Sequence, residues 1–111
     1  MERFVRGSVV VIPFPFSDLS DVKFRPALVL ADLEGNDILL CQITSSCLRE
    51  RYAILLKTTD FQSGSLNRDS YIRPERIFTA DKNIITKTIG IVSNEILDKT
   101  IDTIVNKILK R

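Results

Sequence analysis

In the stretch KFRPALVL, residues 23–30, two cations, Lys23 and Arg25, precede a run of apolar residues that is expected to form a strand. The residues after the proline are small or aliphatic and suit a buried strand. Pro26 biases the preceding Arg25 towards an extended conformation. We therefore expect the guanidinium of Arg25 to project from the rigid beginning of a strand, where its fixed fork of donors fits a phosphate group. The competing interpretation is a surface ion pair between Arg25 and a nearby carboxylate, Asp18 or Asp21.

Short strands are predicted on both sides of this stretch. The β-branched segment 8–14 is the first, and Pro13 and Pro15 are expected to end it as a regular central strand because each lacks a ladder N–H. Further strands are predicted at residues 25–32, 38–45, 52–61 and 70–81, the last bent or edge-like at Pro74, with a polar loop at 15–23, a turn around Gly35-Asn36-Asp37 and a loop at 62–69. Short strands at this tight spacing predict a small barrel or a strongly curved sheet.

The C-terminal segment changes its hydrophobic period. Apolar residues recur at the helical positions Leu97, Ile101, Ile104, Val105 and Ile108. A serine or asparagine at 93–94 is suited to cap this segment, an acidic residue lies in its first turn, and cations crowd its end. One amphipathic helix is therefore expected to close a mainly β fold.

Length and composition indicate one ordinary globular domain, which we place at residues 1–111. The chain is 44% hydrophobic and 27% charged, and its net charge of +2 is compatible with an anionic partner. No apolar run is long enough to cross a membrane, and the N-terminus lacks the apolar segment and cleavage site of a signal peptide. We therefore expect a cytoplasmic protein that has no membrane partner.

Cysteine and histidine content argue against a metal centre. Cys41 and Cys47 are the only cysteines, and in a reducing cytoplasm both are expected to be free thiols, with Cys41 in the core. The chain has no histidine and no Cys-x-x-Cys pair, so we expect no metal, and it has no glycine-rich phosphate loop that would indicate a nucleotide cofactor. The missing histidine also removes the usual general base at neutral pH.

Two further groups of residues are candidates for chemistry. Thr44, Ser45 and Ser46 end an apolar strand with hydroxyls that suit a phosphate or a sugar, or that bond the backbone of a loop. Arg73 and Glu75 are two residues apart in an extended segment and so share a face. This second pair is either acid–base machinery acting on a phosphodiester or an ordinary surface ion pair.

Phenylalanines flank the first loop at positions 14, 16 and 24. Exposed ones would stack on unpaired bases, as in proteins that bind single-stranded nucleic acids. The alternative is that these rings belong to the core.

Taken in order, these segments resemble the MazF/PemK family of toxin endoribonucleases. The resemblance rests on RGSVVVIPFPFSD (6–18), KFRPALVL (23–30) and LLCQITSS (39–46), followed by the late segment from Arg68 to Leu109. It implies an SH3-like β-barrel with a C-terminal helix, a fold shared with the CcdB-type gyrase poisons. It further implies a homodimer, held in check by a cognate antitoxin, that cleaves single-stranded RNA, often messenger RNA, without a metal. The implied products carry a 2′,3′-cyclic phosphate and a 5′-hydroxyl.

The same resemblance implies roles for individual residues. In one branch of the family, the arginine of the Arg-Pro pair and the threonine that ends the third strand carry catalysis, which matches Arg25 and Thr44. In another branch, an Arg-x-acid pair acts together with a histidine of the first loop. Arg73 and Glu75 match that pair, but the histidine has no counterpart here and the acid is a glutamate instead of an aspartate. Residues expected to bind RNA are Lys23, Arg25, Thr44, Ser45, Arg49, Arg51 and Arg73.

Two other functions remain open at this point. One is an RNA-binding barrel that has the fold but no catalytic activity. The other is a gyrase poison, which is disfavoured because the chain lacks the terminal Trp-Gly-Ile of CcdB-like proteins.

Overall fold

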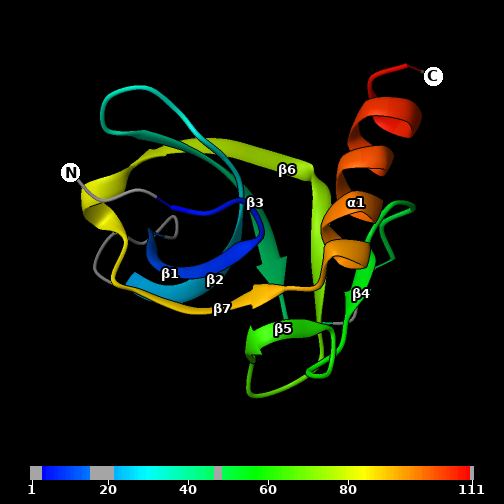
Figure 1. Cartoon of the computed structure of the whole chain (residues 1–111), viewed down its shortest axis with the longest axis horizontal. Coiled ribbons are helices and arrows are strands. Elements are labelled where there is room, and N and C mark those ends of the chain that lie inside the picture. Colours follow the sequence, from blue (N-terminus) through cyan, green and yellow to red (C-terminus); the bar gives the residue numbers. More distant parts are fainter. Residues whose placement is uncertain (1–3, 16–21, 47–48, 111) are drawn as a thin grey trace.

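The computed structural model describes residues 4–15, 22–46 and 49–110. Its elements are β1 (Ser8–Pro15), β2 (Val22–Asp32), β3 (Asp37–Thr44), β4 (Ile54–Leu56), β5 (Phe61–Gly64), β6 (Ser70–Asp81), the 3₁₀ turn η1 (Lys82–Ile84), β7 (Lys87–Val92), α1 (Asn94–Asp102) and the π-helical turn η2 (Thr103–Ile108). The strands form one antiparallel sheet in the order β4-β6-β3-β2-β1-β7-β5, and this sheet curls into a half-barrel (Figure 1). The mainly β, SH3-like fold with a C-terminal helix is therefore confirmed.

Apolar residues on the two faces of the curled sheet form two hydrophobic clusters. The first contains Val9, Leu28, Cys41, Ile43 and Ile72, and partly buried residues of the C-terminal helix pack against it. The second contains alternate residues of the same strands: Val10, Ile12, Ala27, Val29, Ile38 and Leu40. Because side chains alternate along a strand, a strand that serves both clusters is apolar almost throughout, as predicted for β3.

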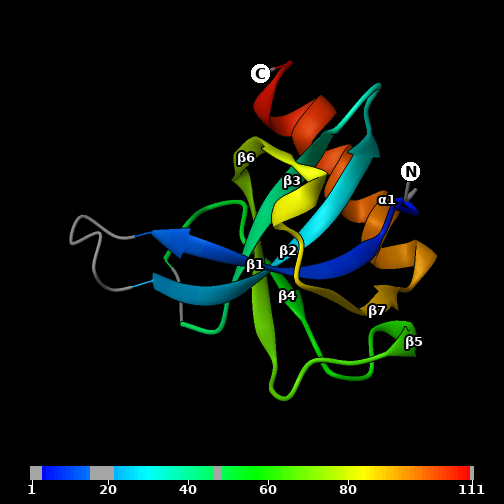
Figure 2. The same ribbon diagram turned by 90° about the vertical axis from the view of Figure 1, so that its left-hand side faces the viewer.

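β1 and β2 continue beyond the rest of the sheet as a two-stranded arm (Figure 2). β1 pairs with β7 only as far as Val11, and β2 pairs with β3 only from Ala27 onwards. Beyond these points each of the two strands has only the other as its partner, up to Pro15 opposite Val22. Pro13 and Pro15 lie in this arm, where β1 no longer pairs with β7, so the expectation that they do not belong to a regular central strand is confirmed, although the ladder with β2 continues to Pro15.

Three other boundaries differ from the sequence-based expectation. β2 begins at Val22, three residues before the expected start, and the predicted strand at 52–61 is only Ile54–Leu56 with a separate β5 after it. β7 (Lys87–Val92) was not predicted, because its alternation is interrupted by Gly90. β6 spans Ser70–Asp81 as predicted, and β4 pairs only with its first three residues, so Pro74 lies where β6 pairs with β3 alone, in agreement with an edge-like strand at that point. Its Pro74 is accommodated where the register with β3 shifts.

The C-terminal helix begins where the sequence predicts. Ser93 is its N-cap, and the Ser93 hydroxyl accepts a hydrogen bond from the Ile96 N–H at 3.3 Å. No helix among the described residues is long and apolar enough to cross a membrane.

Candidate active site

Arg25 of β2 and Thr44 of β3 lie where the pairing between these two neighbouring strands ends. Ala27 of β2 pairs with Gln42 of β3 in an antiparallel ladder. Arg25 and Thr44 each lie two residues beyond that pair, so both are expected on the same face of the sheet. Both residues also line a pocket of about 270 Å³, which we name the Thr44 pocket.

The hydroxyl of Thr44 is held in place by its own loop. Thr44 is buried, and its Oγ1 accepts a hydrogen bond from the backbone N–H of Ser46 at 3.2 Å. A threonine hydroxyl has one hydrogen to donate besides the lone pairs that accept. The contact with Ser46 uses a lone pair, so the hydroxyl hydrogen of Thr44 is left to donate to a ligand.

The connection 65–69 supplies the other wall of the Thr44 pocket, with Leu66, Asn67 and Arg68. It joins β5, which pairs with β7, to β6, which pairs with β3. In a flat sheet these strands would lie about 24 Å apart. The chain from Gly64 to Ser70 can span only about 21 Å when fully extended. The curl of the sheet shortens that distance, and it brings residues 66–68 next to Arg25.

Gly64 allows this connection to leave β5 close to β7. Its φ of +66° lies in the left-handed region, and a Cβ atom there would lie 2.2 Å from the carbonyl oxygen of Ile89. Gly90, its partner on β7, is similarly crowded, because a Cβ atom there would lie 2.7 Å from the Ser63 oxygen. The close approach of the two backbones therefore requires glycine at both positions.

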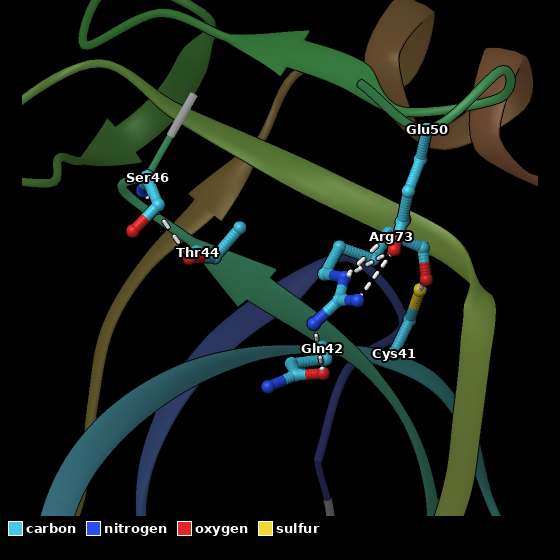
Figure 3. A network of polar contacts seen from close by, with 6 residues as sticks. All are labelled: Cys41, Gln42, Thr44, Ser46, Glu50 and Arg73. Carbon is cyan, nitrogen blue, oxygen red and sulfur yellow. Dashed lines mark hydrogen bonds and ion pairs between the residues drawn. The ribbon is translucent and has the colours of Figure 1, made fainter. Parts of the chain in front are cut away.

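Arg73 of β6 does not line the Thr44 pocket, and its contacts are shown in Figure 3. Its Nε–H donates to both carboxylate oxygens of Glu50 at 3.2 and 3.1 Å, and its Nη2 forms an ion pair with the same carboxylate. Its Nη1 donates to Oε1 of Gln42 at 2.9 Å. Arg73 is thus held by one residue of the loop after β3 and by one residue of β3 itself.

These contacts perturb the acid–base properties of the residues involved. The hydrogen bonds from Arg73 lower the pKa of the Glu50 carboxyl, and the bonded carboxylate raises the pKa of Arg73. Cys41 donates its S–H to the Arg73 carbonyl at 3.0 Å, and burial raises the pKa of the Cys41 thiol to about 12. Cys41 is therefore an unreactive core thiol, as predicted. Cys47 lies outside the described residues.

The carboxylate that pairs with Arg73 is Glu50, whereas the sequence suggested Glu75. Glu75 is exposed, and it acts on Arg73 only through a weak Coulombic attraction. The sequence contains no signal for Glu50, because its pairing depends on where the loop after β3 folds. Gln42 was missed for the same reason.

The other residues expected to bind RNA are distributed more widely. Ser45 is exposed and lines the Thr44 pocket. Lys23, Arg49 and Arg51 are exposed but line neither of the two pockets described here, and the Arg51 guanidinium lies over the Tyr52 ring at 5.3 Å from its centroid. Asp18 and Asp21, the alternative partners of Arg25, lie outside the described residues, and their pairing with Arg25 stays a hypothesis.

The phenylalanines that flank the first loop differ in their burial. Phe14 packs on Phe78 with 5.4 Å between ring centroids and belongs to the second cluster. Phe24 is 63% exposed and borders the Thr44 pocket, so the core interpretation is wrong for this ring. Phe16 lies outside the described residues.

A curled β-sheet with a C-terminal helix, and with an arginine and a hydroxyl donor beside one pocket, defines a small β protein that is suited to binding anions. The family described as PemK-like, MazF-like toxin of type II toxin-antitoxin system matches residues 5–109. The chain belongs to this family. A search of curated protein sequences found no match.

Solved structures agree with this assignment at the level of the fold. The crystal structure of MazE-MazF (Form-II) from Deinococcus radiodurans superposes with a TM-score of 0.74 at 15% identity, covering 96% of each chain. An endoribonuclease from a mycobacterial species gives a TM-score of 0.71 at 17% identity, covering 95% of this chain and 90% of that one. A mycobacterial endoribonuclease in complex with its cognate antitoxin gives 0.69 at 14% identity, covering 93% and 95%.

Proposed function

We propose that this protein is the toxin of a toxin–antitoxin pair and acts as an endoribonuclease on single-stranded RNA at short sequences. Membership of the MazF-like toxin family supports this function, as do similar folds among proteins named endoribonucleases. The observation that carries the proposal is that Arg25 and Thr44, from separate strands, line one pocket.

The reaction that suits these residues needs no metal. The 2′-oxygen of one nucleotide attacks the adjacent phosphorus, the bond from phosphorus to the 5′-oxygen breaks, and the 2′-proton is lost while the leaving oxygen gains one. The products are a 2′,3′-cyclic phosphate and a 5′-hydroxyl. RNA is required because only RNA carries the nucleophile.

Arg25 and Thr44 would act on the charge that develops during this reaction. The phosphate passes through a five-coordinate dianionic state, and donors fixed in advance stabilise it more than they stabilise the ground state. The guanidinium of Arg25 would bond the equatorial oxygens, and the Thr44 hydroxyl would donate a further hydrogen bond. Glu75 stays a candidate general base, although no carboxylate lines either of the two pockets built by the described residues.

One experiment tests the reaction class and the metal independence together. The pure protein is incubated with a long unstructured RNA in EDTA, and the new ends are analysed. We expect fragments that end in cyclic phosphate and begin with a 5′-hydroxyl. Intact RNA under these conditions, with RNA bound but uncut, would favour a non-catalytic binding barrel.

We further propose a cognate antitoxin as a protein partner. Solved structures with this fold include an endoribonuclease in complex with its cognate antitoxin and a MazE-MazF pair. An acidic, disordered antitoxin segment would compete with RNA for the same cations.

A symmetric homodimer is the assembly that we propose for the free toxin. Large apolar side chains are exposed at Leu55 of β4, Ile77 of β6, Val105 of η2, and Leu109 directly after η2. A self-complementary interface would bury such residues. Sedimentation at micromolar concentration should give twice the chain mass, and a clean monomer of 12.6 kDa would contradict the dimer.

A further inference from the structure

A second pocket, of about 310 Å³, adjoins the Thr44 pocket, and the proposed chemistry does not use it. We name it the Lys87 pocket. The two pockets share Phe24, Arg25, Pro26, Leu66 and Asn67, so they are neighbouring compartments along one wall. Arg25 is the only charged residue common to both.

The floor of the Lys87 pocket is built by cross-strand neighbours. Val11 of β1 pairs with Pro26 of β2 on one side and with Lys87 of β7 on the other. Residues directly opposite each other in a sheet project from the same face, so these side chains form one row. Ile89, two residues after Lys87, also lines the pocket. The row is apolar except at its end, where Lys87 stands exposed.

This composition differs from that of the Thr44 pocket. The Thr44 pocket has the hydroxyl residues Thr44, Ser45 and Ser70 and the cation Arg68, which suit a phosphate and a ribose. The Lys87 pocket combines the apolar side chains of its floor with the polar residues Ser65 and Asn67 and with two cations, Arg25 and Lys87. A flat apolar surface next to cations is how single-stranded nucleic acids are bound without a duplex, because bases contact the apolar surface and phosphates contact the cations.

Phe24 adds a base-stacking surface at the boundary between the pockets. It borders both of them, and its 63% exposure leaves the ring available for contact with a ligand. A phenylalanine so exposed on a strand contributes little to the core, whereas an unpaired base would cover it.

We propose that the Lys87 pocket binds the nucleotide next to the scissile phosphate, with its base on the Val11–Pro26–Ile89 floor and its outer phosphate on Lys87. The RNA then passes from the Thr44 pocket across Arg25 into the Lys87 pocket. This inference rests on the proposed ribonuclease function and extends it to a second subsite.

The test uses short RNA substrates that extend the cleaved dinucleotide by one nucleotide on either side. In the wild type, extension on one side should lower KM by about tenfold, the gain typical of one stacked base. Removing only the base of that added nucleotide, with an abasic residue, should abolish most of this gain. Lys87→Ala should also abolish most of the gain in KM that the added nucleotide gives the longer substrate. It should leave KM for the minimal substrate unchanged.

Lys107→Ala is the matched control, because it removes an exposed lysine of the helical segment η2 that lines neither pocket. It should leave KM for both substrates unchanged. Equal effects of Lys87→Ala and Lys107→Ala would mean that only net charge matters, and the subsite assignment would be wrong.

Binding separates this inference from the reaction itself. Oligonucleotides with a 2′-deoxy residue at the cleavage position cannot be cut, and their affinity is measured against salt. Lys87→Ala should reduce the slope of log affinity against log salt by about 0.7, as for one phosphate contact on a single strand. If the wild type cuts no RNA but still shows this dependence on Lys87 and on the adjacent base, the reaction is refuted and the nucleotide subsite stands.

The opposite pattern overturns the subsite. If the wild type cuts RNA and Lys87→Ala changes neither KM nor the salt slope at any length, the Lys87 pocket does not bind RNA. If the same variant instead weakens binding of an oligo-glutamate peptide, the pocket serves an acidic protein partner, and the nucleotide assignment is equally wrong.

Discussion

Arg25 of β2 and Arg73 of β6 both lie on strands of the curled sheet, yet their surroundings differ. Arg25 borders two pockets and stands at the base of the β1–β2 arm. Arg73 is bound by Glu50 and Gln42, and its side chain is only 16% exposed. Of the five N–H donors of a guanidinium, three are engaged in these contacts, and the edge formed by Nε and Nη2 is fully occupied by Glu50.

This comparison indicates different roles for the two arginines. A phosphate that approached the Nε–Nη2 edge of Arg73 would have to displace a carboxylate already bonded there. A ligand in either pocket meets Arg25 without disturbing that ion pair. We therefore expect Arg25 to act on RNA, and Arg73 mainly to hold the loop after β3 against β3. Each variant below tests this division.

Replacing Arg25 should give the largest effect. Arg25→Ala is expected to lower the rate of RNA cleavage by about 10²-fold or more, as the loss of a key transition-state donor does. Thermal unfolding should change little. Arg6→Ala, which removes an exposed arginine that lines neither pocket, is the control for net charge. A variant at position 25 that folds normally and cuts at the original rate would make Arg25 a surface ion-pair residue.

Thr44→Val should give the next largest effect. Valine keeps the β-branched shape and removes the hydroxyl, so we expect a rate loss of about tenfold for one donor. Thr44→Ser retains the hydroxyl and should keep most of the activity. The comparison is made by single-turnover kinetics, and equal losses in the two variants would assign the effect to packing instead of hydrogen bonding.

Glu50→Gln should affect stability more than catalysis. It removes the charge that bonds Arg73 but retains the shape, and we expect the free energy of unfolding to fall by about 1–2 kcal/mol. The cleavage rate should change by less than about threefold, because Arg73 stays in the protein and Arg25 is untouched. Denaturant titration and the cleavage assay together check this. A rate loss as large as that of Arg25→Ala would place the Glu50–Arg73 pair in the reaction.

The pH dependence of stability should report the same ion pair. Arg73 lowers the pKa of Glu50 in the folded protein, so the pair contributes its full stabilisation above the unfolded pKa of about 4.3. The contribution is lost as pH falls through the lower, folded pKa. The difference in unfolding free energy between the wild type and Glu50→Gln should therefore be constant near neutral pH and shrink below about pH 4. A difference that stayed constant in acid would show that the carboxylate charge is not its source.

The smallest effect is expected for Glu75→Gln. Glu75 is exposed, and its attraction for Arg73 is the weakest of the influences on that guanidinium. Activity and stability should both stay close to those of the wild type, as judged by the cleavage assay and thermal unfolding. A loss comparable to that of Arg25→Ala would instead support catalysis by the Arg-x-acid pair.

The strands and the helix were largely predictable because they depend on local patterns. β3, β6 and the Ser93-capped helix begin within a residue of their predicted positions, since hydrophobic period and capping are read from neighbouring residues. The expectation for Pro13 and Pro15 held, because both lie in the arm, where β1 no longer pairs with β7. The prediction failed at β7, where Gly90 occupies a strand and lies close to the backbone of Gly64.

The candidate site divides in the same way. Arg25 and Thr44 were proposed from the sequence pattern and from the family resemblance, and the structure places both of them in the lining of the Thr44 pocket. The sequence analysis missed three residues that line the pockets: Asn67, Arg68 and Lys87. The sequence of a loop, or of a strand that was not predicted, does not indicate which distant residues it will contact in the fold.

The sequence by itself determined the alternation that builds the strands, the amphipathic helix, and an extended arginine that precedes Pro26 in a strand. Only the tertiary structure decided that the sheet curls and that the connection 65–69 therefore lies against Arg25. It also decided that Glu50, and not Glu75, binds Arg73. The reason is physical: alternation and capping act between residues a few positions apart, whereas pockets and ion pairs depend on which distant segments the closing sheet brings together.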